Sequence, residues 1–149
     1  MSFQISGLPL AQFQPLFALG DAELAARQIV RRVADKRPGF PCRVSLRDAE
    51  VGERVLLLNY EHLAVASPYR SRHAIYVREN AQPARLEVNQ VPEALTIRLL
   101  SVRAFDGEGM LRAADVLPGQ ELERVIGSMF GDGAVRYLHV HNAKQGCFA

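Results

Sequence analysis

The sequence predicts an α+β fold: one domain over residues 1–149, with a mostly antiparallel or mixed sheet of about five strands packed with two to three helices. Three observations support this prediction. A chain of 149 residues suits one domain. Several short apolar runs have the character of strands, and two longer segments carry apolar residues at helical spacing. Turns join the expected strands more often than helices do, which favours an antiparallel sheet over a doubly wound one.

The first helix is expected between Asp21, which can cap its N-terminus, and Lys36. Before it, residues 10–17 predict an apolar turn that packs on the core. Within the helix, apolar residues recur at helical spacing, and charged residues take the other side. The apolar residues are Ala22, Ala25, Ala26, Ile29, Val30 and Val33. Pro38 and Gly39 end the helix.

Two strands are expected after this helix. "RVLLLNYEH", residues 54–62, is largely apolar on both faces, which indicates a central strand covered on both sides. "HAIYVRE", residues 73–79, is the second strand and follows a loop around Pro68. Residues 39–53 are expected to form a loop with a short strand, and residues 80–90 an exposed connection.

The second half of the chain predicts a short helix, two paired strands, a longer helix and a last strand. Pro92 suits a first helical position, and the helix is expected to give way to a strand near Leu100. A turn at "FDGEGM" leads to a returning strand at residues 110–117. The segment "PGQELERVIGSMFGDG" is the longer helix, and "AVRYLHVHN", residues 134–142, is the last strand. The apolar side of the longer helix comprises Leu122, Val125, Ile126 and Met129.

Composition excludes several classes of partner. Hydrophobic residues make up 48% of the chain and charged residues 23%, as in a soluble globular protein. Acidic and basic residues are mixed and the net charge is +2, so no nucleic-acid partner is expected. No apolar run approaches the length of a membrane span, and the N-terminus lacks the features of a signal peptide. A cytoplasmic location is therefore expected, where a disulfide between Cys42 and Cys147 would be unusual.

Four stretches carry a resemblance to a known family. They are "PGFPCRVSLRDAEVGERVLLLNYEH", "SPYRSRHAIYVRE", "LLSVRAFDGEGM" and "YLHVHNAKQGCFA". In this order they resemble a bacterial family known only as domain of unknown function 1203, and the similarity covers nearly the whole chain. The resemblance implies a small cytosolic single-domain protein. It implies no activity, cofactor or catalytic residue, so every functional expectation rests on the residues themselves.

The last strand places two histidines on one face. His139 and His141 project to the same side as Tyr137, because residues two apart in a strand share a face. Two such imidazoles can hold one metal ion, but a zinc centre needs a third and usually a fourth ligand. Candidates for these further ligands are Cys42, Cys147, His62 and His73. The spacing is not that of a zinc finger, so a hydrogen-bonded strand face and a non-metal ligand site remain alternatives.

A cysteine nucleophile is a further hypothesis. Cys42 lies beside Arg43, and nearby guanidinium groups favour the thiolate form of a cysteine. His139 or His141 could act as its base, with Asn142 as the orienting amide. The alternative is that Cys42 is a small buried residue, as most free cysteines are.

The loop "SPYRSRHAI" indicates a site for a small anion, because Arg binds carboxylate and phosphate groups and loops often carry binding residues. Arg103 could join this site; otherwise it is expected to be exposed at a sheet edge or paired with Asp106 or Glu61. The proposed ligand-binding residues are Arg43, Tyr69, Arg70, Arg72, His73, Arg103, His139, His141 and Asn142.

The expected function is a small soluble binding domain for a small anionic molecule. The alternative is a metal-binding protein or a Cys/His enzyme that uses Cys42, His139, His141 and Cys147. The sequence assigns no cofactor and no oligomeric state.

Overall fold

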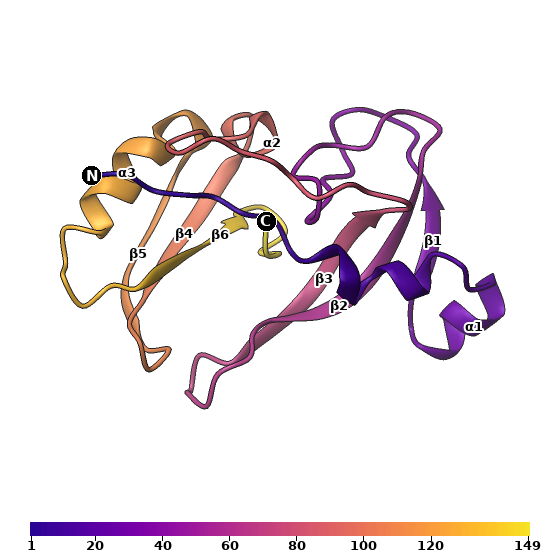
Figure 1. Cartoon of the computed structure of the whole chain (residues 1–149), viewed down its shortest axis with the longest axis horizontal. Coiled ribbons are helices and arrows are strands. Elements are labelled where there is room, and N and C mark those ends of the chain that lie inside the picture. The colour runs from indigo at the N-terminus through magenta and orange to yellow at the C-terminus, as the bar shows by residue number, and fades with distance from the viewer.

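Two separate antiparallel sheets of three strands each, rather than one sheet of about five strands, form the framework of the chain (Figure 1). The computed structural model describes residues 1–149. Its strand orders are β1-β2-β3 in the first sheet and β5-β4-β6 in the second. The α+β class is confirmed, and all strand pairs within the two sheets are antiparallel.

The first sheet consists of β1 (Val30–Val33), β2 (Arg54–Leu63) and β3 (Ser71–Arg78). β2 is the central strand, as its two apolar faces predict. Leu56 and Leu58 belong to the main core of this half, and Val55 packs on the other side with two buried alanines. Two short 3₁₀ turns, Leu10–Gln12 and Gln14–Leu16, flank the buried Phe13, so the expected apolar turn is present.

The first helix is much shorter than expected. α1 covers only Asp21–Ala26, and the prediction of a helix to Lys36 is wrong. Gln28 adopts a left-handed backbone (φ 59°), which stops the helix, and the chain continues into β1. Three of the apolar residues assigned to the helix are the β-branched Ile29, Val30 and Val33, which suit an extended strand better than a helix. Gly20 is the N-cap residue, and Asp21 lies in the first turn instead of capping it.

The second sheet follows the predicted order of elements. α2 (Glu93–Thr96) leads into β4 (Leu99–Phe105), and a tight turn returns the chain as β5 (Leu111–Pro118). A 3₁₀ turn (Gly119–Glu121) precedes α3 (Leu122–Met129), and β6 (Tyr137–Asn142) is the last strand. The longest helix is eight residues, and no helix has the length and apolar character needed to cross a membrane.

The two faces of the second sheet have different roles. The apolar side of α3 is buried as predicted, and it packs with Leu138 and Val140 of β6. The intervening residues of β6 point to the opposite face, toward the first sheet. His139 lies directly opposite Arg103 in the register of β6 and β4, and His141 lies opposite Ser101. The face of the second sheet that carries the histidines therefore points toward the junction between the two sheets.

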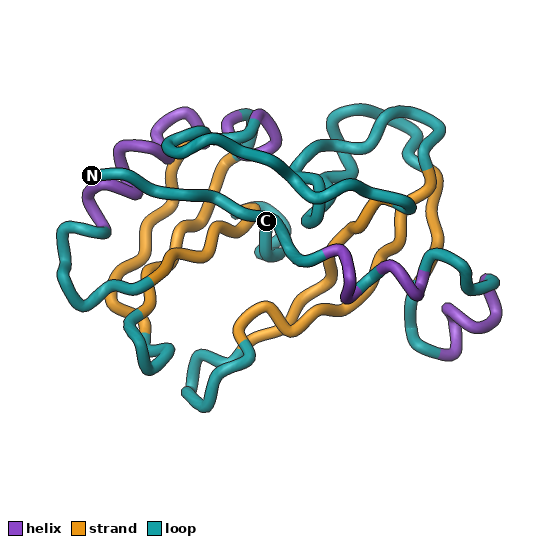
Figure 2. Tube along the Cα trace, viewed as in Figure 1, coloured by secondary structure: helices purple, strands orange, loops and turns teal.

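Polar contacts and the two ends of the chain join the sheets. The N-terminal segment runs across both halves, and the C-terminus lies between them (Figures 1 and 2). Arg98 makes a two-point ion pair with the buried Asp48, at 2.6 Å and 2.8 Å. At the opposite end, the hydroxyl of Ser67 donates to the carbonyl of Gly109 at 2.9 Å, which links the β2–β3 and β4–β5 hairpin loops.

Candidate functional site

Three histidines from the two sheets meet at this junction. His62 comes from β2, and His139 and His141 come from β6. Each histidine offers one ring nitrogen, and these three nitrogens all lie within 4.8 Å of one another. The ring centroid of His62 is 4.8 Å from that of His141 and 6.0 Å from that of His139. These three residues are called the histidine group below.

Two local features aim these side chains at one another. The strand periodicity of β6 places His139 and His141 on the same face, as predicted. In β2, the pairing register with β3 shifts between Tyr60 and Leu63, so His62 lies within an irregularity of the strand. A bulge of this kind bends a strand and re-aims its side chains. The side chain of His62 therefore points away from the first sheet and reaches the histidine-bearing face of the second.

Each ring has a buried nitrogen without a hydrogen-bond partner. These atoms are Nδ1 of His62, Nδ1 of His139 and Nε2 of His141. In His141 the other nitrogen, Nδ1, lies 3.0 Å from the carbonyl oxygen of Gly146. A carbonyl only accepts, so Nδ1 of His141 carries the proton and Nε2 carries the lone pair. This hydrogen bond is the kind that fixes the tautomer of a metal-ligating histidine.

The surroundings keep all three rings neutral. Burial lowers the pKa of His62 and of His139 to about 4, and it lowers the pKa of His141 to about 3. The positive charge of Arg103 lowers the pKa of each ring further. At neutral pH the rings are therefore unprotonated, which is the form that binds metal ions.

Phe148 forms one wall of the histidine group. Its ring stacks on His62 with centroids 5.1 Å apart and planes inclined by 7°, and it presents an edge-type contact to His139 and His141. His141 is 1% exposed, whereas His62 and His139 are partly exposed. The group is thus closed by an aromatic side chain on one side and open to solvent at two of its rings.

Arg103 is a partly buried cation beside this group without a partner of its own. It lies in β4, the central strand of the second sheet, so the prediction of an edge position is wrong. The expected pairing with Asp106 or Glu61 is wrong too. Glu61 pairs with Arg70, and Asp106 accepts hydrogen bonds from backbone N–H groups of its own turn. No carboxylate oxygen lies within 4.0 Å of the Arg103 guanidinium.

The two cysteines stay apart from the histidine group. The Cys42 sulfur is buried and accepts from the backbone N–H groups of Ser45 and Arg78, so no histidine adjoins it as a base. Cys147 contacts Arg43 at 3.0 Å and the Asn142 amide at 3.7 Å. Neither thiol belongs to the metal-competent group, so the arrangement of Cys42, Cys147, His139 and His141 considered from the sequence is not formed. His62 takes the third position instead.

The residues predicted to bind an anion are dispersed. Arg70 pairs with Glu61 at 2.8 Å, and Arg72 donates to the side chain of Asn59. Tyr69 is exposed and forms a T-shaped pair with Phe105. Arg43 is 2% exposed and donates to the carbonyls of Pro41 and Phe148, so its visible role is to hold the C-terminal tail. His73 is partly exposed and lies outside the histidine group.

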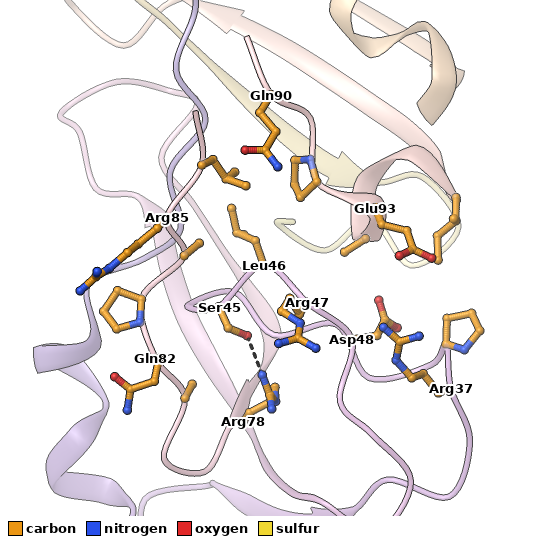
Figure 3. Close-up of a pocket in the computed structure, with 18 of the residues that line it drawn as sticks. Arg37, Ser45, Leu46, Arg47, Asp48, Arg78, Gln82, Arg85, Gln90 and Glu93 are labelled. Atoms are coloured by element: carbon orange, nitrogen blue, oxygen red, sulfur yellow. Dashed lines mark hydrogen bonds between the residues drawn. The ribbon is translucent and has the colours of Figure 1, made fainter. Parts of the chain in front are cut away.

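The largest cavity lies away from the histidine group. It has a volume of about 560 Å³ and is bordered by Arg37, Pro38 and residues 45–48, by residues 78 and 80–86, and by residues 90, 92–94 and 97 (Figure 3). Three of its six charged residues are paired: Arg37 with Glu50, Arg78 with Glu53, and Asp48 with Arg98. The unpaired charges are those of Arg47, Arg85 and Glu93, so the surplus at this cavity is a single positive charge.

The fold and the site define an α+β protein of two three-stranded antiparallel sheets with a three-histidine group at their junction. Residues 39–149 match the model of the family described as "Protein of unknown function (DUF1203)", and the chain belongs to this family. The matched region contains the histidine group, Arg103 and Phe148, whereas α1 and β1 precede it. No curated protein and no solved structure matches the chain.

Proposed function

We propose that the chain binds a divalent transition metal ion, of the zinc type, through His62, His139 and His141. The observation that carries this proposal is the convergence of three neutral imidazoles from different sheets, each with a buried nitrogen that lacks a hydrogen bond. Buried polar atoms normally have a partner, and three unpartnered nitrogens on neighbouring rings suit an ion. Imidazole is a preferred ligand of zinc, copper and nickel.

The number of protein ligands indicates how the ion would be used. Structural zinc sites are closed by four protein ligands, whereas catalytic sites have three and keep the fourth position for water or substrate. No Cys, Asp or Glu joins the histidine group, so the fourth position is free of protein ligands. An ion held in this way would lower the pKa of a bound water and could support hydrolytic or hydration chemistry.

Arg103 supports an addition to this proposal: an anionic ligand or substrate binds at the same site. A cation without a partner close to the histidine group would repel a bare dication and attract an anion bound to it. The small anionic molecule expected from the sequence is thus assigned to Arg103 and the metal, rather than to the Tyr69–Arg72 loop. Both cysteines are free, and we place the protein in the reducing cytoplasm.

The test is metal binding by the full chain. The chelator-treated protein would be titrated with Zn²⁺ by calorimetry and with Co²⁺ by absorption in the visible region. We expect one site per chain. Substitutions His62→Ala, His139→Ala and His141→Ala should each weaken binding by more than the roughly 10–100-fold that loss of an outer-shell partner costs.

His73→Ala is the matched control, because His73 is the remaining histidine of the chain and lies outside the group. It should bind Zn²⁺ like the unchanged protein. If all four alanine variants bind with equal affinity, or if the unchanged protein binds no metal, the three rings serve packing alone and the proposal is wrong.

A further inference from the structure

A second, smaller cavity, lined in part by the C-terminal tail, has an unusual charge balance. It has a volume of about 330 Å³ and is bordered by the segment before β2, by the start of β4 and by the tail after β6. Four cationic side chains line it, and no acidic side chain does. The cations are Lys36, Arg43, Arg98 and Lys144.

Lys36 and Lys144 are the only two lysines of the chain, in which all the other basic residues are arginines. Both lie at this cavity, from segments more than a hundred positions apart, and neither makes an ion pair within 4.0 Å. Placing two like charges around one concavity costs energy unless an anion is present. Two strongly hydrated, mobile ammonium groups at the rim suit the capture of an exchangeable small ion.

The floor of the cavity carries an uncompensated charge as well. Arg43 is only 2% exposed. Its acceptors are two carbonyls and the Cys147 sulfur rather than a carboxylate. Arg98 is neutralised by Asp48, so the net charge contributed around the cavity is that of Arg43 and the two lysines. Concave surfaces lined by one sign of charge concentrate counter-ions.

An independent observation comes from Asn142, which also lines this cavity. Its side chain is buried (4% exposed), and its Oδ1 atom has no hydrogen-bond donor within reach. An amide oxygen left without a donor in a buried position costs about 1–3 kcal/mol. This oxygen is almost wholly buried, so a ligand hydroxyl in the cavity could donate to it after a small shift of the Asn142 side chain.

We propose that this cavity binds a small oxyanion, a carboxylate or a phosphate, that also carries a hydrogen-bond donor. Lys36 and Lys144 hold its charge at the rim, the guanidinium of Arg43 provides the positive potential of the floor, and Asn142 accepts from its donor. The site is separate from the histidine group, since none of its lining residues is a member of that group.

The experiment is a titration of the chelator-treated full chain with inorganic phosphate and with glycolate, followed by amide NMR at constant ionic strength. We expect saturable shifts at Asn142, Lys144 and Cys147. The double variant Lys36→Gln/Lys144→Gln should weaken phosphate binding at least tenfold. The control Arg112→Gln/Arg124→Gln removes the same charge from exposed ion pairs elsewhere and should change it less than twofold.

Acetate, which lacks the hydroxyl of glycolate, should bind more weakly than glycolate, and Asn142→Ala should remove the difference. Linear, non-saturating shifts, or equal losses in the two double variants, would show screening of surface charge only and would overturn the proposal. Because the protein is free of metal throughout, this outcome is independent of whether the histidine group binds an ion.

Discussion

At the scale of single residues, Arg103 is the charge that would most affect which ion the proposed metal site accepts. Its guanidinium is partly buried, has no acceptor and lowers the pKa of all three neighbouring rings. Burial does most to keep the rings unprotonated, and the charge of Arg103, which adds to this effect, would also oppose a bare metal ion. If the histidine group binds a metal ion as proposed, Arg103 would link that binding to the presence of an anion.

Arg103→Met should raise the affinity for Zn²⁺ at least about tenfold, which corresponds to about 1.4 kcal/mol of repulsion removed. The same variant should weaken the binding of azide to the Co²⁺-loaded protein, measured by the change in its visible absorption. Arg112→Met, in the neighbouring strand β5, is the control and should alter neither quantity. A fall in Zn²⁺ affinity for Arg103→Met would contradict this account.

The histidine group also predicts how the stability of the metal-free protein depends on pH. The three pKa values in the folded state, about 4, 4 and 3, lie below the ordinary value of 6.5. As the pH falls below 6.5, the unfolded chain takes up protons first. The stability associated with the neutral rings is therefore complete above pH 6.5 and is lost as the pH falls through 4 toward 3.

Urea midpoints at pH 7.5, 6, 5 and 4 would measure this loss. The triple variant His62→Gln/His139→Gln/His141→Gln removes the titrating rings while other groups titrate as before. We expect the difference in urea midpoint between the two proteins to change steadily below pH 6.5, because the unchanged protein loses more stability. A constant difference over this range would show that the rings are not held neutral.

At the scale of elements, the junction between α1 and β1 shows where sequence periodicity misleads. Residues 21–33 fit a helical pattern, but the strand partner of β1 lies on β2, more than twenty positions away. The pattern of one segment contains no information about that partner. By contrast, α3 buries the predicted apolar side, because the period of an isolated amphipathic helix is a local property.

Gln28 offers a test of this junction. A non-glycine residue in the left-handed region costs about 1–2 kcal/mol, and glycine avoids most of this cost while losing some through the entropy of the unfolded chain. Gln28→Gly should therefore raise the free energy of unfolding by up to about 1 kcal/mol, measured by urea denaturation. Gln28→Val should lower it, and a gain in stability for the valine variant would contradict the assigned backbone conformation.

At the scale of the whole molecule, the two sheets share no strand pairing and have separate main cores. The ion pair between Arg98 and Asp48 is one of the contacts that hold them together. Asp48 has 3% of its side chain exposed and also accepts the backbone N–H of Gly39 at 2.9 Å. Burial raises the pKa of Asp48, but the hydrogen bonds from Arg98 and Gly39 outweigh it and keep the pKa below its ordinary value.

Arg98→Ala should lower the free energy of unfolding by about 3–5 kcal/mol, because it leaves the buried Asp48 carboxylate without its partner. Urea denaturation would measure the loss. Arg124→Ala breaks an exposed pair on α3 and should cost less than about 1 kcal/mol. The double variant Arg98→Ala/Asp48→Ala should lose less than the sum of the two single variants; strict additivity would exclude a direct pair.

The packing of the whole molecule determines which parts of the candidate site could be predicted from the sequence. The shared face of His139 and His141 follows from the strand period alone. His62 was one of several possible third ligands, because its position depends on a bulge in β2 and on how the two sheets face each other. Both features arise from tertiary packing. The loop of Tyr69, Arg70 and Arg72 has the composition of an anion site, yet its arginines find partners within the chain.

The origin of the histidine group on two different sheets has a consequence for the unfolded chain. An ion held by His62 and His139 ties together positions 77 residues apart and so acts as a reversible cross-link. For a covalent link, closing a loop of this size reduces the entropy of the unfolded state by the equivalent of about 4–5 kcal/mol. Sheets that have no hydrogen-bonded strand in common would then open as one unit when the ion is bound, and separately when it is removed.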